Sequence, residues 1–128
     1  SRGLGDVYKR QKVYEAAQRV KGTTQSNLLY EAAIIERTLG NTDNAATTIT
    51  AALVANPNNF QMRLVHIDLA LSTGDAITVK KEIDWCLLRR PDSQKLQGRI
   101  QRLKQLRIKQ ASMPTTFDAA AEEPGARR

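Results

Sequence analysis

The turn residues of this sequence recur at one fixed interval. The spacing from Gly40 to Gly74 equals the spacing from Pro57 to Pro91, and we call this interval the repeat period. Glycine suits the left-handed backbone conformation just past a helix end, whereas proline cannot continue a helix. Further positions recur with the repeat period, in the pairs Ala32/His66, Ile49/Ile83, Ala52/Cys86 and Leu53/Leu87. The period predicts an array of two-helix units, each of which buries its apolar face against its neighbours.

Apolar residues between these turns fall at helical spacing. In residues 25–39 they occupy positions 28, 29, 32, 35 and 39, which lie on one face of a helix. The same pattern predicts helices at 42–55, 60–73, 75–89 and 94–110, with one more upstream around residues 13–20. Asp75 is expected to cap one of these helices, and Thr42 or Asp43 another, because short oxygen-bearing side chains accept hydrogen bonds from free backbone N–H groups. Turns are predicted at 56–59 and 90–93.

The segment LGNTDNAATTITAALVANPNN, residues 39–59, resembles the second half of a tetratricopeptide repeat. The family pattern combines a helix-ending glycine, small residues, one bulky apolar residue and a closing proline. The matching positions are Gly40, Ala45, Ile49, Ala52 and Pro57, and then Gly74, Val79, Ile83, Cys86 and Pro91. The resemblance covers residues 26–93 as two whole repeats. It implies an all-α, right-handed solenoid of antiparallel helix-turn-helix hairpins.

The first helix of each unit departs from the family pattern. The position that carries an aromatic residue in the family is Leu29 in one unit and Arg63 in the next. The family's Leu-Gly pair is replaced by residues 32–33 and 66–67. These departures leave the helix crossing angles and the shape of the inner surface open.

Three segments are expected along the chain. Residues 6–11 match the translation of a common transposon-end sequencing adapter, so 1–11 are predicted to be a partly non-native leader; a genuine helix start is the alternative. Residues 12–110 are predicted to form the repeat domain, as part of a larger, multi-repeat bacterial protein. Residues 111–128 mix Pro, Thr, Ala and Glu without a period and are predicted to be a disordered tail.

The resemblance implies a protein-interaction scaffold whose first helices line a concave groove. The groove would hold a partner peptide or a neighbouring domain, because amides hydrogen-bond a peptide backbone while Leu and Tyr contact its side chains. For Ile34, Leu64 and Leu71 the alternative is packing between helices. The groove residues are predicted to be Asn27, Tyr30, Ile34, Arg37, Gln61, Leu64, Asp68 and Leu71, with Thr38, Ser72, Lys95, Arg102 and Gln105 beside them.

The net charge of +7 is concentrated in residues 89–109. Three interpretations of this basic segment stand: a solvated face that ends the array, a surface for an acidic partner or anionic lipid, or a nucleic-acid surface. No aromatic stacking platform accompanies the charges, which weighs against nucleic acid. The basic residues are Arg89, Arg90, Lys95, Arg99, Arg102, Lys104, Arg107 and Lys109.

No motif of catalysis or cofactor binding is found in the sequence. One histidine and one cysteine provide no metal-ligand spacing, and neither a phosphate-binding glycine loop nor a nucleophile elbow occurs. His66 is expected to be satisfied by a neighbouring hydrogen bond, Cys86 to be buried and inert, and Trp85 to cover the next unit. We therefore expect no enzyme, cofactor or metal. An accessory region of a larger enzyme is the remaining alternative. The sequence specifies neither compartment nor oligomeric state, and a cytoplasmic location is favoured.

Overall fold

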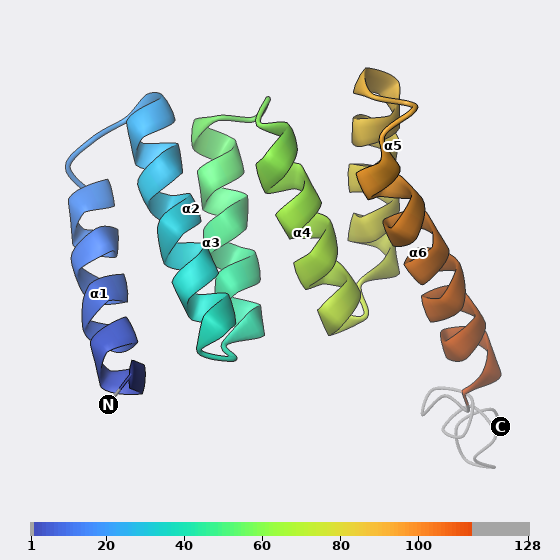
Figure 1. Cartoon of the computed structure of the whole chain (residues 1–128), viewed down its shortest axis with the longest axis horizontal. Helices are drawn as coiled ribbons and strands as arrows, with labels where there is room; N and C mark the ends of the chain where they lie inside the picture. The colour runs from blue at the N-terminus through green and yellow to red at the C-terminus, as the bar shows by residue number, and fades with distance from the viewer. Residues whose placement is uncertain (1, 114–128) are drawn as a thin grey trace, which may run out of the picture.

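In the computed structural model, which describes residues 2–113, the chain forms six α-helices and, within that range, no strand. Successive helices alternate in direction and lie in a row in chain order (Figure 1). The predicted all-α class is confirmed. The helices are α1 (Arg2–Ala17), α2 (Gly22–Thr38), α3 (Thr42–Ala55), α4 (Phe60–Thr73), α5 (Ala76–Arg89) and α6 (Gln94–Ser112).

The helix ends follow local capping chemistry. Asp75 accepts a hydrogen bond from the Thr78 backbone N–H at 3.1 Å, as predicted. The cap predicted for α3 is wrong, because its N-cap residue is Asn41, which makes no side-chain cap bond. Thr42 and Asp43 already lie in the first turn of that helix. Asn59 caps α4 through the Met62 N–H at 3.0 Å, a role that the sequence analysis missed.

The repeat period is also present in the structure. α3 and α5 begin one repeat period apart, and they end one repeat period apart as well. Gly40 and Gly74 both have left-handed φ angles, of +84° and +76°. In both turns the residue after the glycine donates its backbone N–H to a carbonyl of the preceding helix. Asn41 donates to the Glu36 carbonyl, and Asp75 donates to the Ala70 carbonyl, at 2.9 Å each. This is the Schellman arrangement, which satisfies the last carbonyls of a helix.

Two hydrophobic cores run along the row, and α4 contributes to both. Met62, Val65 and Leu69 pack with α1, α2 and α3, whereas residues 64, 67 and 70 pack with α5 and α6. The central helix is therefore apolar on two sides. The first core contains Ala17, Leu29, Ala33, Ala45, Ile49, Ala52, Leu53, Met62, Val65 and Leu69, and the second Leu64, Ile67, Ala70, Val79, Ile83, Cys86, Leu96 and Leu103.

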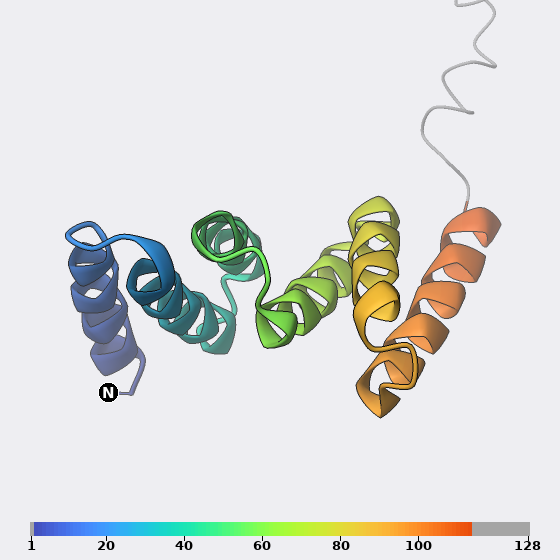
Figure 2. The same ribbon diagram turned by 90° about the horizontal axis from the view of Figure 1, so that it is seen from above.

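Helices contact mainly their neighbours in the chain. Each helix packs on the next one, and α6 also packs on α4. Seen from above, the helices zigzag, so that α2 and α4 lie on one side of α3 (Figure 2). No helix among residues 2–113 is long and apolar enough to cross a membrane.

The outer segments are described in part. Residues 2–11 of the predicted leader are helical within α1, and Arg10 donates to Glu36 of α2 at 2.7 Å. At the other end α6 continues to Ser112, two residues into the predicted tail. Residues 114–128 of that tail lie outside the described residues.

Candidate functional site: the arginines around Asp68

Asp68 lies on α4, and only 9% of the residue is exposed. Arg99 of α6 donates to both carboxylate oxygens, with Nε at 2.9 Å and Nη2 at 2.8 Å. The same guanidinium donates to the Lys95 carbonyl at 2.7 Å, which holds it along α6. Two parallel hydrogen bonds between an arginine and a carboxylate are stronger and more directional than a single ion pair. The Arg99–Asp68 pair therefore fixes α6 against α4.

Two further arginines approach the same carboxylate. Arg37 of α2 lies 4.0 Å from one Asp68 oxygen, and Arg102 of α6 lies 3.5 Å from the other. Their side chains are 47% and 53% exposed, whereas that of Arg99 is 20% exposed. Three cations thus surround one anion. Arg37, Asp68 and Arg102, which the sequence analysis placed in one groove, are brought together.

We call the surface formed by α2, α4 and α6 around Asp68 the inner face. Most other residues predicted for the groove retain exposed area there. Tyr30, Ile34 and Leu71 are half-buried, and they pack partly against the two cores. The exposed ones are Asn27, Thr38, Gln61, Ser72, Lys95 and Gln105.

Leu64 is the exception to the predicted groove. Its side chain is wholly buried in the second core, so it has no surface with which to contact a partner. For this residue the alternative of packing between helices holds. The reason is that α4 is covered on two sides, by α5 and by α6.

The basic side chains of residues 89–109 contact different parts of the molecule. Arg89 stacks on Trp85 with its guanidinium 3.7 Å from the ring centroid, and Arg90 stacks on Phe60 at 4.2 Å. Arg99 and Arg102 contact Asp68. Three others line hollows elsewhere: Lys104 and Arg107 between α5 and α6, and Lys109 beside Gly74.

A second polar network joins α4 to α5 behind the inner face. Glu82 is buried, with one oxygen 2.8 Å from the Arg63 guanidinium and the other 2.5 Å from His66 Nδ1. Burial raises the pKa of Glu82, but the hydrogen bonds and charges of His66 and Arg63 outweigh it, and the net pKa is lowered. His66 has the neighbouring hydrogen bond that was expected.

Arg63 connects this network to the Trp85 ring and to the turn before α4. Its guanidinium stacks 4.4 Å from the Trp85 ring and donates through Nη2 to the Pro57 carbonyl at 2.7 Å. It therefore ties the α3–α4 turn to α5. This network was not predicted from the sequence; the polar residues at 63 and 66, within the apolar-periodic segment 60–73, were the available signal.

Cys86 is fully buried, and burial raises the pKa of its thiol to about 11. The prediction of a buried thiol is confirmed, and a thiol with such a pKa is almost entirely un-ionised at neutral pH. Among the described residues, no group of three or more His, Cys, Asp or Glu side chains is placed to hold a metal ion.

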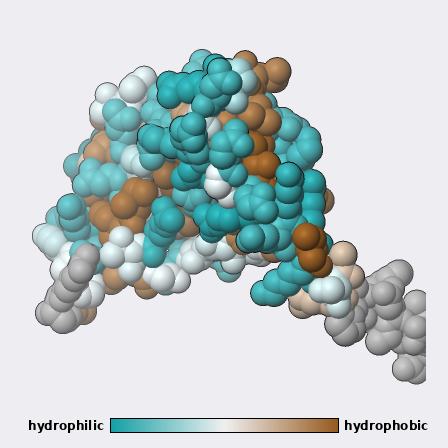
Figure 3. Space-filling model, turned by 45° about the vertical axis from the view of Figure 1, so that its right-hand side comes forward, coloured by the Kyte–Doolittle hydropathy of each residue, from teal (hydrophilic) through white to brown (hydrophobic). Residues whose placement is uncertain are grey.

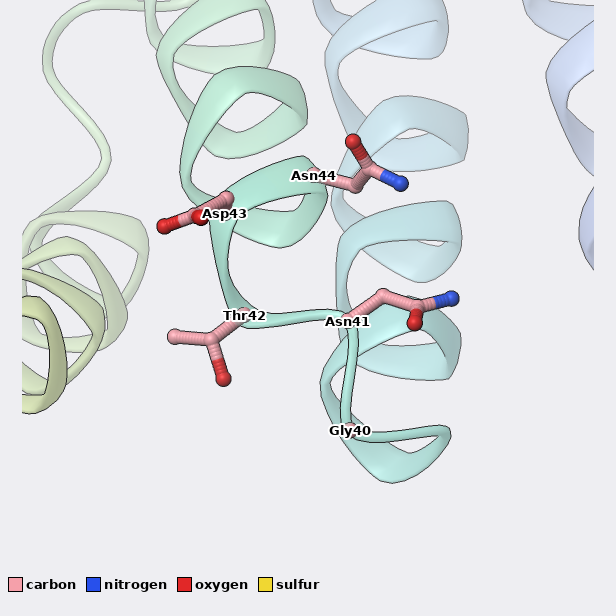
Figure 4. Close-up of a pocket in the computed structure, with 5 residues that line it drawn as sticks. All are labelled: Gly40, Asn41, Thr42, Asp43 and Asn44. Atoms are coloured by element: carbon pink, nitrogen blue, oxygen red, sulfur yellow. The ribbon is translucent and has the colours of Figure 1, made fainter.

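A hollow of about 350 Å³ lies at the α2–α3 turn (Figure 4). It is lined by five consecutive residues of that turn, Gly40, Asn41, Thr42, Asp43 and Asn44. The Asn41 and Asn44 side chains point to one side and Asp43 to the other (Figure 4). Because these side chains do not converge and no second element contributes, the hollow is the outside of a bend. The inner face is the stronger candidate.

Comparison of the chain with protein-family models, with curated proteins and with solved structures finds no match. The candidate site therefore rests on its own geometry.

Proposed function

We propose that the chain is a tetratricopeptide-like, right-handed α-solenoid that acts as a protein-interaction scaffold. A partner peptide, or a neighbouring domain of a longer protein, would bind along the inner face. One observation carries the proposal: Asp68 contacts arginines from both α2 and α6, so three alternate helices contribute to one surface. A surface of this kind presents side chains in a row, which suits an extended or helical segment.

The repetition of helix bounds and turns supports the solenoid. α3 and α5 are offset by one repeat period, and the two glycine turns share the same backbone hydrogen bonds. Contacts between successive helices dominate, as in arrays whose units are stabilised by their neighbours.

The chemistry of the inner face favours a peptide ligand. Asn27 and Gln61 are exposed amides that can pair with a peptide backbone, and Tyr30, Ile34 and Leu71 offer partly exposed apolar area. By contrast, three of the eight basic residues of 89–109 are already held: Arg89 and Arg90 stack on aromatic rings, and Arg99 donates to both oxygens of Asp68. A peptide is thus favoured over nucleic acid, whose binding relies on cations free to meet phosphates.

The test is a peptide-display selection on the whole chain, followed by affinity measurement on variants of the inner face. Asn27→Ala combined with Gln61→Ala removes two exposed amides without opening a core. We expect the selected peptides to bind this double variant about tenfold more weakly, since each lost hydrogen bond contributes about 0.5–1.5 kcal/mol.

The matched control changes two exposed apolar residues of α3 and α5, through Val54→Ala and Ile77→Ala. Both side chains are more than two-thirds exposed, at 79% and 73%. Peptide affinity is expected to be unchanged in this control. Selected peptides that lose affinity in the control, and keep it in the amide variant, would contradict the proposal.

A further inference from the structure

We propose that the partner of the inner face carries carboxylates, and that Arg37 and Arg102 are the residues that bind them. This inference rests on the proposed function and specifies its ligand as an acidic peptide segment. The starting observation is an imbalance of charge, because three guanidinium groups meet a single carboxylate.

Asp68 is already satisfied by one of the three arginines. Arg99 takes both carboxylate oxygens at hydrogen-bond distance, in the paired geometry that arginine and carboxylate prefer. Arg37 and Arg102 lie farther away, at 4.0 Å and 3.5 Å. Their ion pairs with Asp68 are therefore weak, and within residues 2–113 most of their N–H donors have no other partner, so a ligand can accept from them.

The exposure of the two arginines allows a ligand to reach them. About half of each side chain is accessible, while Asp68 itself is only 12% exposed. A ligand approaching the inner face thus meets two cations, with the anion beneath them. Arg37 also lies in the last turn of α2, where a helix end favours a cation.

The two guanidinium groups are positioned together by different helices. Arg37 comes from α2 and Arg102 from α6, yet both lie within 4.0 Å of the same carboxylate. Attraction to Asp68 holds the two cations close despite their mutual repulsion. Such a pair suits two neighbouring carboxylates, or one carboxylate held by both arginines, and planar guanidinium groups recognise this geometry better than lysine does.

The hydropathy of the surface agrees with a mainly polar ligand. On the side drawn in Figure 3, hydrophobic residues form separate patches between larger hydrophilic areas. An acidic segment that also carries one or two apolar residues would match both the arginines and the partly exposed Ile34 and Leu71.

The experiment compares two labelled peptides that differ only in charge, by fluorescence anisotropy on the full chain. One peptide has ten residues in which two Glu alternate with two Ala. The other peptide is identical except that Gln replaces every Glu. We expect the Glu peptide to bind at least tenfold more tightly than the Gln twin. Arg37→Ala combined with Arg102→Ala should remove at least tenfold of its affinity, or about 1.4 kcal/mol.

The matched control is Lys104→Ala combined with Arg107→Ala. It also removes two positive charges, both from α6, at the hollow facing α5 rather than α4. Affinity for the Glu peptide should change less than twofold. The Arg102→Glu variant should bind a peptide in which Lys replaces Glu more tightly than the wild type does. A purely structural role of Arg102 would not produce this change of preference.

Equal losses in the two double variants would overturn the inference, because the Glu peptide would then bind any basic surface. Tighter binding of a ten-nucleotide oligothymidylate, lost in the same arginine variant, would overturn it in favour of nucleic acid. Display-selected peptides that are neutral and depend on Asn27 and Gln61, but not on the arginines, would also overturn it. In that last case the proposed scaffold function would stand.

Discussion

Glu82 is the residue whose charge most directly links α4 to α5. It is buried, and both of its oxygens are paired, one with Arg63 and the other with His66. Removing one member of a buried network leaves its partners without a counter-charge, which costs more than the network itself contributes. This carboxylate therefore gives a stability prediction with a defined sign.

Glu82→Gln is expected to lower the free energy of unfolding by about 2–3 kcal/mol at pH 7. Because the folded-state pKa of Glu82 lies below its ordinary value of 4.5, its stabilisation is fully present above pH 4.5 and is lost as the pH falls through the folded pKa. The difference between wild type and variant should shrink below pH 4.5. Urea unfolding at a series of pH values measures it.

Asp84→Asn provides the matched control on the same helix. Asp84 is 52% exposed, and its ion pair in the described part of the chain is with Lys80 one turn away, so its loss should cost less than about 0.5 kcal/mol at any pH. A Glu82→Gln variant that is as stable as the Asp84→Asn control would contradict the assigned network.

Part of the inner face could be predicted from the sequence because it follows the repeat period. Asp68 and Arg102 are one repeat period apart, so they have the same offset from the glycine and proline turns, and in the structure they contact each other. Arg99 could not be assigned in this way. Its contact depends on the length and direction of its side chain, which spacing alone does not specify.

At the level of helices, the sequence predicts helix bounds correctly where helical spacing of apolar residues is bounded by a glycine or proline turn. The bounds 42–55 and 60–73 were predicted without error for this reason. The start of α2 was predicted three residues late, because Gly22, Thr23 and Thr24 carry no apolar marker. For Leu64 the sequence left both a groove position and packing between helices open, because its burial depends on α5 and α6 packing against α4 together.

The glycines that end α2 and α4 are expected to stabilise the turns that follow these helices. Gly40→Ala and Gly74→Ala should each lower the free energy of unfolding by about 1–2 kcal/mol, because a Cβ disfavours the left-handed φ of +84° or +76°. A Cβ at Gly40 meets no atom within 4 Å, so the cost there comes from backbone conformation alone. Denaturant unfolding measures both changes.

Gly98→Ala in α6 is the control with the opposite sign. A Cβ there also meets nothing within 4 Å, and the residue is inside a helix. Alanine is therefore expected to stabilise by about 0.5–1 kcal/mol. If all three substitutions changed stability in the same direction, the assigned turn conformations would be contradicted.

Over the described molecule, α4 is the helix that packs in both hydrophobic cores. It supplies side chains to both cores, and it carries Asp68 on the inner face and His66 towards α5. Contacts otherwise pass from each helix to the next. Because the helices pack in chain order and α6 also packs on α4, the side chains of α2, α4 and α6 form the inner face together.

The most direct measurement is an amide chemical-shift map, recorded by NMR while the Glu peptide is titrated into the full chain. Shifts are predicted to concentrate in α2, α4 and α6, around residues 27, 37, 61 and 102, with the outer residues of α3 and α5 unaffected. Shifts confined to α3 and α5, or spread evenly over every basic residue, would contradict binding at the inner face.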